Sequence, residues 1–313
     1  MATPPLLISS SAGTSLILAG LRTLHDNCKL LEEQGGAAFG PTFPRHANLY
    51  SVMMVLAPIF WHVDGFSCGP FNFILEVTGI KDKQAKYPEF ILMKSRPLVL
   101  DYIENLKNVE VSNILELGIM KGGSCAMFEA LYRPSCHMAI DVYKHDHDGL
   151  AELEKYVASF KRRFKAHYDV SQADIPRIMS EWNSLTGQKS LDIIIDDASH
   201  CYSLSIASFN GLFPHLRPGG VYVIEDWGWA HWNGPWQDTT HPEFNSPALS
   251  NLSIHCVIRT TALALESDRY HRIISKVIST ADQTFVFRGD AAISETFDVR
   301  QNVPMRGRKP FLL

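Results

Sequence analysis

Short apolar segments separated by helical stretches run through the chain from about residue 111 onward. Apolar runs of this length predict strands that are buried on both faces, and the helices between them predict the crossovers of a parallel sheet. The sequence therefore predicts an α/β fold with a Rossmann-like sheet. The expected strands are 113–118, 137–141, 165–170, 191–197, 220–225, 254–259 and 283–288, and the expected helices are 124–132, 150–163, 175–185 and 203–213.

The first 105 residues lack this alternation. Apolar residues at helical spacing predict helices over 10–33, 47–61 and 88–106, with glycine and proline turns between them, and Pro58 is expected to end or kink the second of these helices. We expect residues 1–105 to form a helical cap or oligomerisation region, and residues 106–313 to form the α/β domain. The apolar segment 47–61 favours self-association, so a homo-oligomer is expected.

Composition excludes several classes of protein. The 313 residues are 46% hydrophobic and 20% charged, as in a soluble globular enzyme, and 29 basic residues against 33 acidic ones give a net charge of −4. This charge gives no electrostatic reason to expect nucleic acid or an anionic membrane as a partner. No apolar run is long enough to span a bilayer, the N-terminus lacks the basic start of a secretion signal, and the six cysteines are scattered, so a cytoplasmic protein with reduced thiols is expected.

A glycine-rich turn follows the first strand of the expected sheet. Glycines let a turn tighten and let a ligand approach the backbone, although the G-x-x-x-G-G spacing is not the dinucleotide fingerprint. Asp141 ends the next strand, where an acidic residue binds ribose hydroxyls in nucleotide-binding sheets. A ligand of the adenosine type is therefore expected, and the alternative is a β-to-α turn without a ligand. The candidate contacts are Glu116, Gly118, Gly122, Gly123, Ser124 and Asp141.

Acidic residues also end the fourth and fifth expected strands. Asp196 and Asp197 close one of them, and Glu225 and Asp226 close the other. The carboxyl ends of neighbouring parallel strands meet at one edge of a sheet, and carboxylates that lie close together repel unless a cation intervenes. Oxygen ligands favour Mg²⁺, so Asp197, Glu225 and Asp226 are the expected metal ligands, while Asp196 should face the other side of its strand. The alternative is that these acids cap helices or pair with lysine and arginine.

His200 lies three residues after Asp197 and just before a predicted helix. A helix N-terminus and a nearby cation both disfavour the imidazolium form. A neutral imidazole is what a general base requires near pH 7. We therefore expect His200 to act as a catalytic base, and the alternative is a capping or core histidine.

Four of the six tryptophans lie within ten residues of the loop after the fifth strand. Aromatic rings at the mouth of a site stack on a sugar ring or on an aromatic substrate. Trp227, Trp229 and Trp232 are therefore candidate substrate contacts. Equally open is a loop that packs these rings, together with Trp236, on the N-terminal region or on a partner subunit.

Together these motifs resemble a known family. The Glu-Leu-Gly…Gly-Gly-Ser turn, Asp141, the Ile-Asp-Asp-Ala-Ser-His run and the Val-Ile-Glu-Asp-Trp run are similar to those of class I S-adenosylmethionine-dependent methyltransferases. Within that class they most resemble the Mg-dependent O-methyltransferases of natural-product sugars, of the macrocin and mycinamicin type. The resemblance covers roughly residues 105–290.

This resemblance implies a mostly parallel, seven-stranded methyltransferase sheet within residues 106–313, with S-adenosylmethionine and Mg²⁺ as cofactors. It implies that Asp197, Glu225 and Asp226 hold the metal, that His200 is the base, and that the methyl group moves to a hydroxyl of a glycoside or another small natural product, as in antibiotic biosynthesis. The family often reads adenine through a run that is altered here. Gln172 and Asp174 from that run, and Asp196, are further candidates for cofactor binding.

Three other functions remain open on the sequence. Catechol or phenol O-methyltransferases are a more distant likeness, because they carry an aspartate-asparagine pair where this chain has Glu225 and Asp226. A cephalosporin-hydroxylase-like enzyme would share the fold and similar motifs. A non-catalytic binding or assembly subunit would keep the fold but lose the site residues, which this chain retains.

Overall fold

The computed structural model describes residues 57–77, 84–144, 149–234, 240, 247–260, 272–294 and 296–300. The chain divides into two compact units, Met1–Met53 and Met54–Leu313, and every described residue belongs to the second unit. The helix expected over 10–33 and most of the helix expected over 47–61 therefore lie outside the described residues. Within the described part, no helix is long and apolar enough to cross a membrane.

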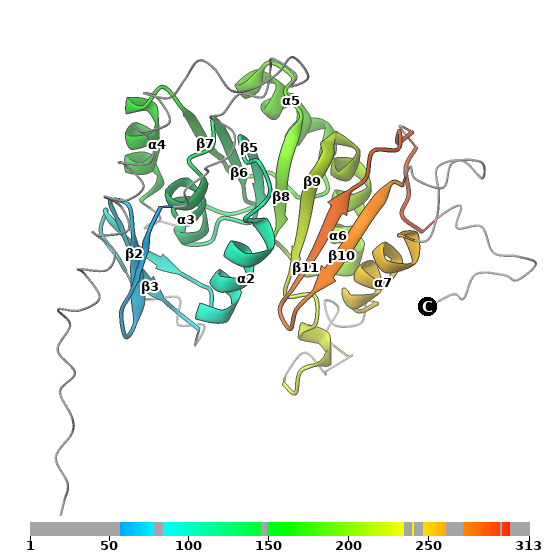
Figure 1. The fold of residues 1–313 in the computed structure, drawn as a ribbon, viewed down its shortest axis with the longest axis horizontal. Helices are drawn as coiled ribbons and strands as arrows, with labels where there is room; N and C mark the ends of the chain where they lie inside the picture. Colours follow the sequence, from blue (N-terminus) through cyan, green and yellow to red (C-terminus); the bar gives the residue numbers. More distant parts are fainter. Residues whose placement is uncertain are drawn as a thin grey trace, which may run out of the picture. The chain divides into compact units, whose positions relative to one another are not determined.

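A seven-stranded, mostly parallel sheet forms the centre of this unit (Figure 1). The five strands β9, β8, β5, β6 and β7 are parallel, whereas β11 runs antiparallel to both β9 and β10. Numbered within the sheet, the order is 3-2-1-4-5-7-6. In space the order is β7 (Arg163–His167), β6 (Cys136–Ile140), β5 (Asn113–Leu117), β8 (Leu191–Asp196), β9 (Leu216–Glu225), β11 (Gln283–Arg288) and β10 (Ile274–Ser279).

The order of the strands fixes where a ligand can bind. The chain adds β6 and β7 on one side of β5, and then returns to add β8 and β9 on the other side. The carboxyl ends of β5 and β8 therefore lie at the point where the strand order reverses. In open α/β sheets, ligands bind at this switch point because the connections diverge there and leave a crevice.

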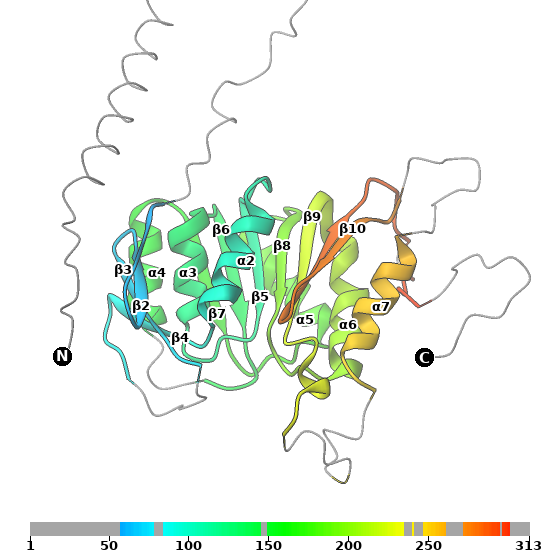
Figure 2. The same cartoon turned by 60° about the horizontal axis from the view of Figure 1, so that its bottom comes forward.

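Helices cover both faces of the sheet (Figure 2). One hydrophobic cluster contains residues of α2, α3 and α4, and the other contains residues of α5, α6 and α7. Successive strand residues enter opposite clusters, as Ile193 and Ile194 do, because side chains alternate along a strand. The helices are α2 (Arg96–Leu106), α3 (Gly123–Tyr132), α4 (Leu150–Ser159), α5 (Ile175–Thr186), α6 (Tyr202–Leu212) and α7 (Ser250–Arg259).

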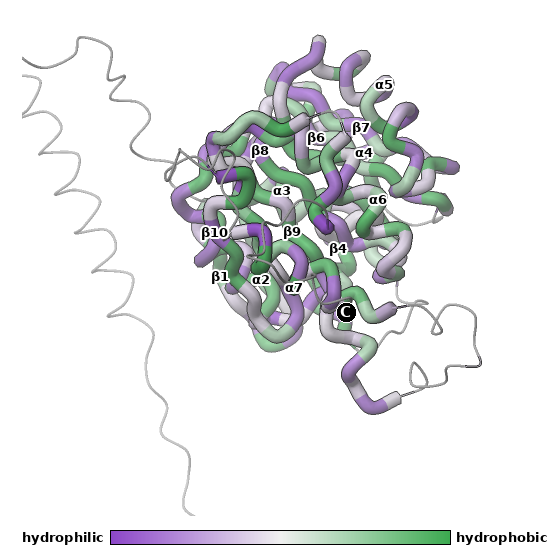
Figure 3. The backbone as a smooth tube through the Cα atoms, turned by 90° about the vertical axis from the view of Figure 1, so that its right-hand side faces the viewer, coloured by the Kyte–Doolittle hydropathy of each residue, from purple (hydrophilic) through white to green (hydrophobic). Residues whose placement is uncertain are grey.

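Hydropathy follows this layering. Hydrophobic segments concentrate in the interior strands such as β8 and β9, and hydrophilic residues lie mostly in the outer segments of the backbone (Figure 3). All six residues of β8 are buried, including the two aspartates Asp192 and Asp196. A continuous apolar run with an acidic end is therefore a strand that is covered on both faces, as the sequence predicts.

A second, four-stranded sheet precedes the large one and packs against α3. Its phenylalanines Phe66, Phe71, Phe73 and Phe90 join the same hydrophobic cluster as α3. The described part of residues 1–105 is therefore not a purely helical cap. The strands are β1 (Ile59–Trp61), β2 (Gly65–Cys68), β3 (Phe71–Leu75) and β4 (Glu89–Leu92), and β3 and β4 pair in parallel.

Two helices predicted in this region are corrected by the structure. The end of the segment 47–61 is strand β1, and the segment 88–106 contains strand β4 before helix α2 begins at Arg96. The Ser95 hydroxyl caps α2 by accepting the Leu98 N–H, and Pro97 lies in the first turn, where proline is tolerated. The helix predicted over 88–106 overlooked that Ser95 and Pro97 together mark the start of a helix. The division after residue 105 stays a prediction.

The third correction concerns 254–259, which was expected to be a strand and lies in helix α7. A short apolar run cannot be assigned to strand or helix by periodicity alone. The seventh strand is instead β10, which the sequence pattern missed. The remaining predicted strands and the four predicted helices are confirmed, with ends that shift by a few residues.

Candidate active site

Two neighbouring strands bring acidic residues together at the carboxyl edge of the sheet. Asp197 follows β8 and Asp226 follows β9, and the two strands pair in parallel. His200 Nε2 lies 3.8 Å from Asp197 Oδ1 and 3.7 Å from Asp226 Oδ2. The ligand atoms of these three residues all lie within 4.8 Å of one another. The convergence expected from the sequence therefore holds for Asp197, His200 and Asp226.

The backbone of this cluster is unusual. His200 and Asp226 have positive φ angles of 56° and 50°, a conformation uncommon in residues with side chains. Hydrogen bonds hold both residues: the His200 carbonyl accepts the indole N–H of Trp229, and the Asp226 N–H donates to the Asp282 carbonyl. Rare backbone conformations held in this way often occur at functional sites.

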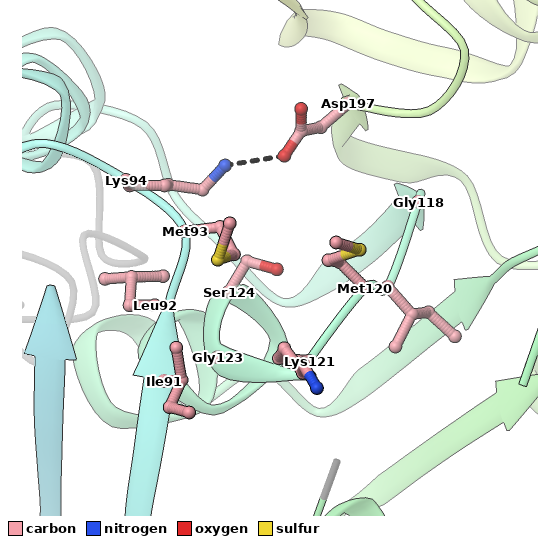
Figure 4. Close-up of a pocket in the computed structure, with 11 residues that line it drawn as sticks. Ile91, Leu92, Met93, Lys94, Gly118, Met120, Lys121, Gly123, Ser124 and Asp197 are labelled. Atoms are coloured by element: carbon pink, nitrogen blue, oxygen red, sulfur yellow. Dashed lines mark hydrogen bonds and ion pairs between the residues drawn. The ribbon is translucent and has the colours of Figure 1, made fainter. Parts of the chain in front are cut away.

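Glu225, the third acid that the sequence assigns to the metal, contacts Lys94 and Tyr102. Its carboxylate accepts hydrogen bonds from Lys94 Nζ at 2.7 and 2.6 Å, and from the hydroxyl of Tyr102. Lys94 Nζ is also 2.7 Å from Asp197 Oδ2 (Figure 4). The sequence left open that these acids pair with lysine. Glu225 and one oxygen of Asp197 do so, because both contact Lys94.

Lys94 is the site residue that sequence reasoning missed. It follows strand β4, and its partners Asp197 and Glu225 lie 103 and 131 residues further along the chain. Burial by itself lowers the pKa of Lys94, but the charges of Asp197 and Glu225 raise it well above its usual value, so Lys94 stays charged. The only local signal was a lysine placed directly after a short apolar run.

The same electrostatics act on the carboxylates. Burial raises the pKa of Asp226; the charge of Asp197 adds to this, whereas His200 and Lys94 oppose it. Carboxylates whose pKa is raised by a neighbouring carboxylate gain from a cation placed between them.

The chemistry of this donor set fits Mg²⁺ at Asp197 and Asp226. Their side chains are 26% and 37% exposed, so they can accept an ion that keeps part of its water shell. Magnesium is commonly held by one or two carboxylates together with water and substrate oxygens. Imidazole is not a usual magnesium ligand, so His200 would be left for another role.

A pocket beside this cluster is formed by two loops (Figure 4). One loop follows β4, and the other is the glycine turn between β5 and α3. The lining residues are Ile91, Leu92, Met93, Lys94, Gly118, Ile119, Met120, Lys121, Gly123, Ser124 and Asp197. The predicted contacts Gly118, Gly123 and Ser124 therefore line a pocket that opens next to Asp197.

Two glycines are required here by close approach of the backbone. Gly118 has a φ angle of 96°, and a Cβ there would lie 2.1 Å from the Asp197 carbonyl oxygen. A Cβ on Gly123 would lie 2.1 Å from the Ile91 carbonyl oxygen. Gly122 directly precedes helix α3 with a φ of 76°, and because it has no side chain, the helix N-terminus at the pocket lacks a capping side chain. An uncapped helix N-terminus favours an anionic ligand group.

Asp141 anchors the glycine turn. Its Oδ2 accepts the backbone N–H groups of Ile119 and Met120, and its Oδ1 accepts that of Tyr143. The carboxylate thus lies at the carboxyl end of β6, where the sequence places a ribose contact. Its role towards a ribose stays a prediction.

Glu116 does not face the pocket. It is fully buried in β5, and its Oε2 lies 3.4 Å from His137 Nε2 on the neighbouring strand β6. His137 Nδ1 in turn lies 3.3 Å from Glu129 Oε1, and Arg162 pairs with the other oxygen of Glu129. Glu116 therefore belongs to a row of four charged or chargeable groups beneath helix α3, and its contacts there are structural.

The other weak cofactor candidates also have structural partners. Asp196 is buried and accepts hydrogen bonds from Gln172 Nε2 at 3.0 Å and from Ser208 Oγ and Tyr222 OH at 2.8 Å each. Burial raises the pKa of Asp196 to about 6. The contacts with Gln172, Ser208 and Tyr222 place Asp196 on the side of the strand opposite to Asp197, as expected. Asp174 caps helix α5 by accepting the Arg177 N–H.

The tryptophans differ in their contacts. Trp227 donates its indole N–H to the Thr280 carbonyl, and Trp229 donates to that of His200. Trp232 is 41% exposed. Trp236 lies outside the described residues. Two of the three candidate substrate contacts are thus used in packing the loop, while Trp232 presents a ring to solvent.

Comparison with known proteins gives a domain family. Residues 115–227 match the family described as Methyltransferase domain. The chain is 31% identical over 140 residues to demethylmacrocin O-methyltransferase of Streptomyces fradiae, covering 42% of this chain and 31% of that protein. It is 54% identical over 128 residues to L-olivosyl-oleandolide 3-O-methyltransferase of Streptomyces antibioticus, covering 39% and 29%. Identity is 58% over 43 residues to mycinamicin VI 2''-O-methyltransferase of Micromonospora griseorubida, covering 14% and 11%.

The aligned segments thus span no more than 31% of the length of these relatives. Among solved structures, the chain is similar to the MycE methyltransferase from the mycinamycin biosynthetic pathway in complex with Mg and SAH, with 22% identity, a TM-score of 0.45, and coverage of 62% of this chain and 50% of that chain. Residues 115–227 thus match a methyltransferase domain family, and the aligned segments resemble the macrocin and mycinamicin type of sugar O-methyltransferase in sequence.

Proposed function

We propose that this protein transfers a methyl group from S-adenosylmethionine to a hydroxyl of a sugar in a glycoside or natural product, with the help of Mg²⁺. The observation that carries the proposal is the convergence of Asp197, His200 and Asp226 beside the glycine-lined pocket of a methyltransferase domain. Two carboxylates that suit a metal and one imidazole are the groups needed to hold and deprotonate a hydroxyl acceptor.

The pocket residues fit the methyl donor. The uncapped N-terminus of α3 suits the carboxylate of its methionine end, and Ser124 lies in the first turn of that helix. Asp141 anchors the same loop and is half-buried, so its carboxylate is in reach of a ribose placed over β6. Residues 118–124 and Asp141 are therefore the proposed cofactor contacts, whereas Glu116 would act through the strand beneath them.

The protein's own groups would perform the proton step. When bound, S-adenosylmethionine supplies the methyl group and Mg²⁺ supplies positive charge beside the acceptor hydroxyl. Asp197 and Asp226 would hold the ion, and His200 would take the hydroxyl proton at Nε2, the nitrogen that faces both carboxylates. General-base catalysis of this kind contributes about 10²–10⁴-fold to a rate. The Trp229 contact would keep His200 in place.

The acceptor is proposed to be a sugar because the related protein from Streptomyces antibioticus is named for an olivosyl compound. Trp232, with its exposed ring, is the proposed stacking surface for that sugar. Residues 1–105 are proposed to mediate self-association. Light scattering of the purified chain measures this role.

The experiment that tests this function follows the mass of the product. The purified chain is incubated with S-adenosylmethionine, Mg²⁺ and a panel of glycosylated macrolides, free sugars and catechols. We expect a gain of one CH₂ unit on a glycoside. A gain of one oxygen would indicate hydroxylation instead, and methylation of catechols alone would move the acceptor to the phenol class. Bound cofactor without product from any glycoside would contradict the proposal.

A further inference from the structure

Gln172 bridges two loops at the carboxyl edge of the large sheet. It lies between β7 and α5 and is only 4% exposed. Its side-chain nitrogen Nε2 donates to Asp196 Oδ1 at 3.0 Å, and its oxygen Oε1 accepts the backbone N–H of Ser199, also at 3.0 Å. Ser199 belongs to the segment 197–200, which also carries a proposed metal ligand and the proposed base. One buried side chain thus connects the end of β8 with this segment.

The partners of Asp196 fix the orientation of this amide. The carboxylate also accepts hydrogen bonds from Ser208 Oγ of α6 and from Tyr222 OH of β9, at 2.8 Å each, and all three residues are buried. An ionised carboxylate only accepts and a backbone N–H only donates, so the nitrogen of Gln172 must face Asp196 and its oxygen must face Ser199. Loss of either bond would leave a buried polar group without a partner, which is costlier than losing an exposed hydrogen bond.

Other contacts hold the two ends of the segment 197–200. At its start, the N–H of Asp197 donates to a carbonyl of β5, and at its end, the carbonyl of His200 accepts an indole N–H from the loop after β9. The bond to Gln172 lies between these two contacts. His200 has a positive φ angle, a conformation that persists only where the surroundings hold it. The contact with Gln172, one residue before His200, is part of that hold.

We infer that Gln172 is a positioning residue for the proposed base. By holding the Ser199 N–H, it keeps the backbone that carries His200 in place, and it takes no part in the proton step. This role goes beyond the cofactor contact that the sequence predicts for Gln172. The inference deepens the proposed function and rests on it, since it concerns the base of the same site.

The first test exchanges the amide and the carboxylate. Gln172→Glu places a second carboxylate against Asp196 with no donor between them, and is expected to lower kcat at least about tenfold. Adding Asp196→Asn restores the bond in the reverse direction, because the new amide nitrogen donates to the glutamate. The amide oxygen can still accept from Ser208 and Tyr222, and the glutamate can still accept the Ser199 N–H.

The double variant has the same net charge as the natural protein, and its kcat is expected to return to within about threefold of the natural value. Such a recovery requires that the bond between positions 172 and 196, rather than either residue alone, supports turnover. A double variant no more active than Gln172→Glu would overturn the inference.

The second test needs neither substrate nor turnover. Gln172→Met keeps the length of the side chain but loses both hydrogen bonds. Hydrogen–deuterium exchange of the full chain, followed by mass spectrometry, is expected to become at least about fivefold faster in peptides covering 197–201, the equivalent of one hydrogen bond, and to stay within about twofold in β5. The matched control Tyr222→Phe also loses a buried bond to Asp196, but its hydroxyl contacts Ser208 rather than Gln172. Equal acceleration in both variants would overturn the inference.

Titration with S-adenosylmethionine separates positioning from contact with the cofactor. In Gln172→Met, kcat is expected to fall about tenfold, because a displaced base reacts slowly, while the Kd for S-adenosylmethionine changes less than about threefold. A raised Kd together with an unchanged kcat would assign Gln172 to the cofactor alone and would contradict the inference.

The two proposals fail in different ways. Faster exchange confined to 197–201 in Gln172→Met, in a protein that methylates no glycoside, would refute the proposed function and leave the hold of Gln172 on this segment intact. Methylated product together with an unchanged kcat in Gln172→Met would refute the role of Gln172 alone.

Discussion

Trp229 donates the N–H of its indole ring to the backbone carbonyl of His200, with 2.9 Å between Nε1 and the oxygen. The accepting residue has a positive φ angle, which is uncommon for a residue with a side chain. The contact ties the loop after β9 to the loop after β8 and holds the backbone that carries the imidazole. We therefore interpret Trp229 as a residue that positions the proposed base, while the more exposed Trp232 stays the candidate for stacking on the acceptor.

Replacement of Trp229 by phenylalanine tests this interpretation. The variant keeps an aromatic ring but loses the N–H donor, so we expect kcat to fall roughly threefold to tenfold, the equivalent of one hydrogen bond. The affinity for S-adenosylmethionine, measured by calorimetry, should not change. Trp227→Phe is the matched control, because it loses an equivalent bond to Thr280 that does not involve His200. Equal losses of kcat in both variants would speak against a specific role for Trp229.

Replacement of His200 by alanine tests the proton step itself. We expect kcat to fall by about 10²–10⁴-fold, the usual contribution of a general base, because no other imidazole belongs to the described cluster at the strand ends. Cofactor affinity should stay within about twofold, since His200 does not line the glycine pocket. Steady-state kinetics and a cofactor titration give the two quantities. A variant with full turnover would remove His200 from the mechanism.

Chelation tests the role of the carboxylates. Treatment with EDTA is expected to abolish methyl transfer, and added Mg²⁺ is expected to restore it, because Asp197 and Asp226 repel each other without a cation. Thermal unfolding, followed with and without Mg²⁺, should show a higher Tm with the ion, since a ligand bound only to the folded state stabilises it. Full activity after rigorous chelation would mean that these acids serve another purpose.

The pH dependence of stability tests the buried row that contains Glu116. Burial by itself lowers the pKa of His137, but the neighbouring carboxylates of Glu116 and Glu129 raise it to about 9. A pKa raised above the unfolded value of about 6.5 gives stability that is fully present below pH 6.5 and is lost as the pH rises through 9. From the size of this shift, the loss is up to about 3 kcal/mol.

Urea unfolding at pH 6.5 and pH 9 measures this loss. His137→Gln cannot be protonated in this range, so the difference in unfolding free energy between the two pH values should be smaller in the variant than in the natural protein. Arg162 contacts Glu129 at the end of the row and stays charged throughout. An identical pH dependence in both proteins would show that His137 is neutral when folded.

The sequence by itself determined the sheet and the edge at which the site lies. Short apolar runs such as 191–196 form strands that are covered on both faces of the sheet, because they have no polar side to turn towards water. Segments with a helical pattern separate these runs. Acidic residues at the ends of two parallel strands must then meet, because neighbouring carboxyl ends share one edge. Asp197, His200 and Asp226 could for this reason be found without a structure. The segment 254–259 could not be assigned correctly, since its pattern suits a strand and a helix equally.

Tertiary structure decided the partners of the individual side chains. Glu225 ends β9 directly before Asp226, yet its carboxylate contacts Lys94 and Tyr102, which come from a distant part of the chain. Lys94 reaches the site from the segment that follows a strand of a different sheet, 103 residues before Asp197. Periodicity and spacing report only on neighbours along the chain. A contact across such a separation depends on how the two sheets and helix α2 pack, and that packing is set by side-chain shape over the whole core.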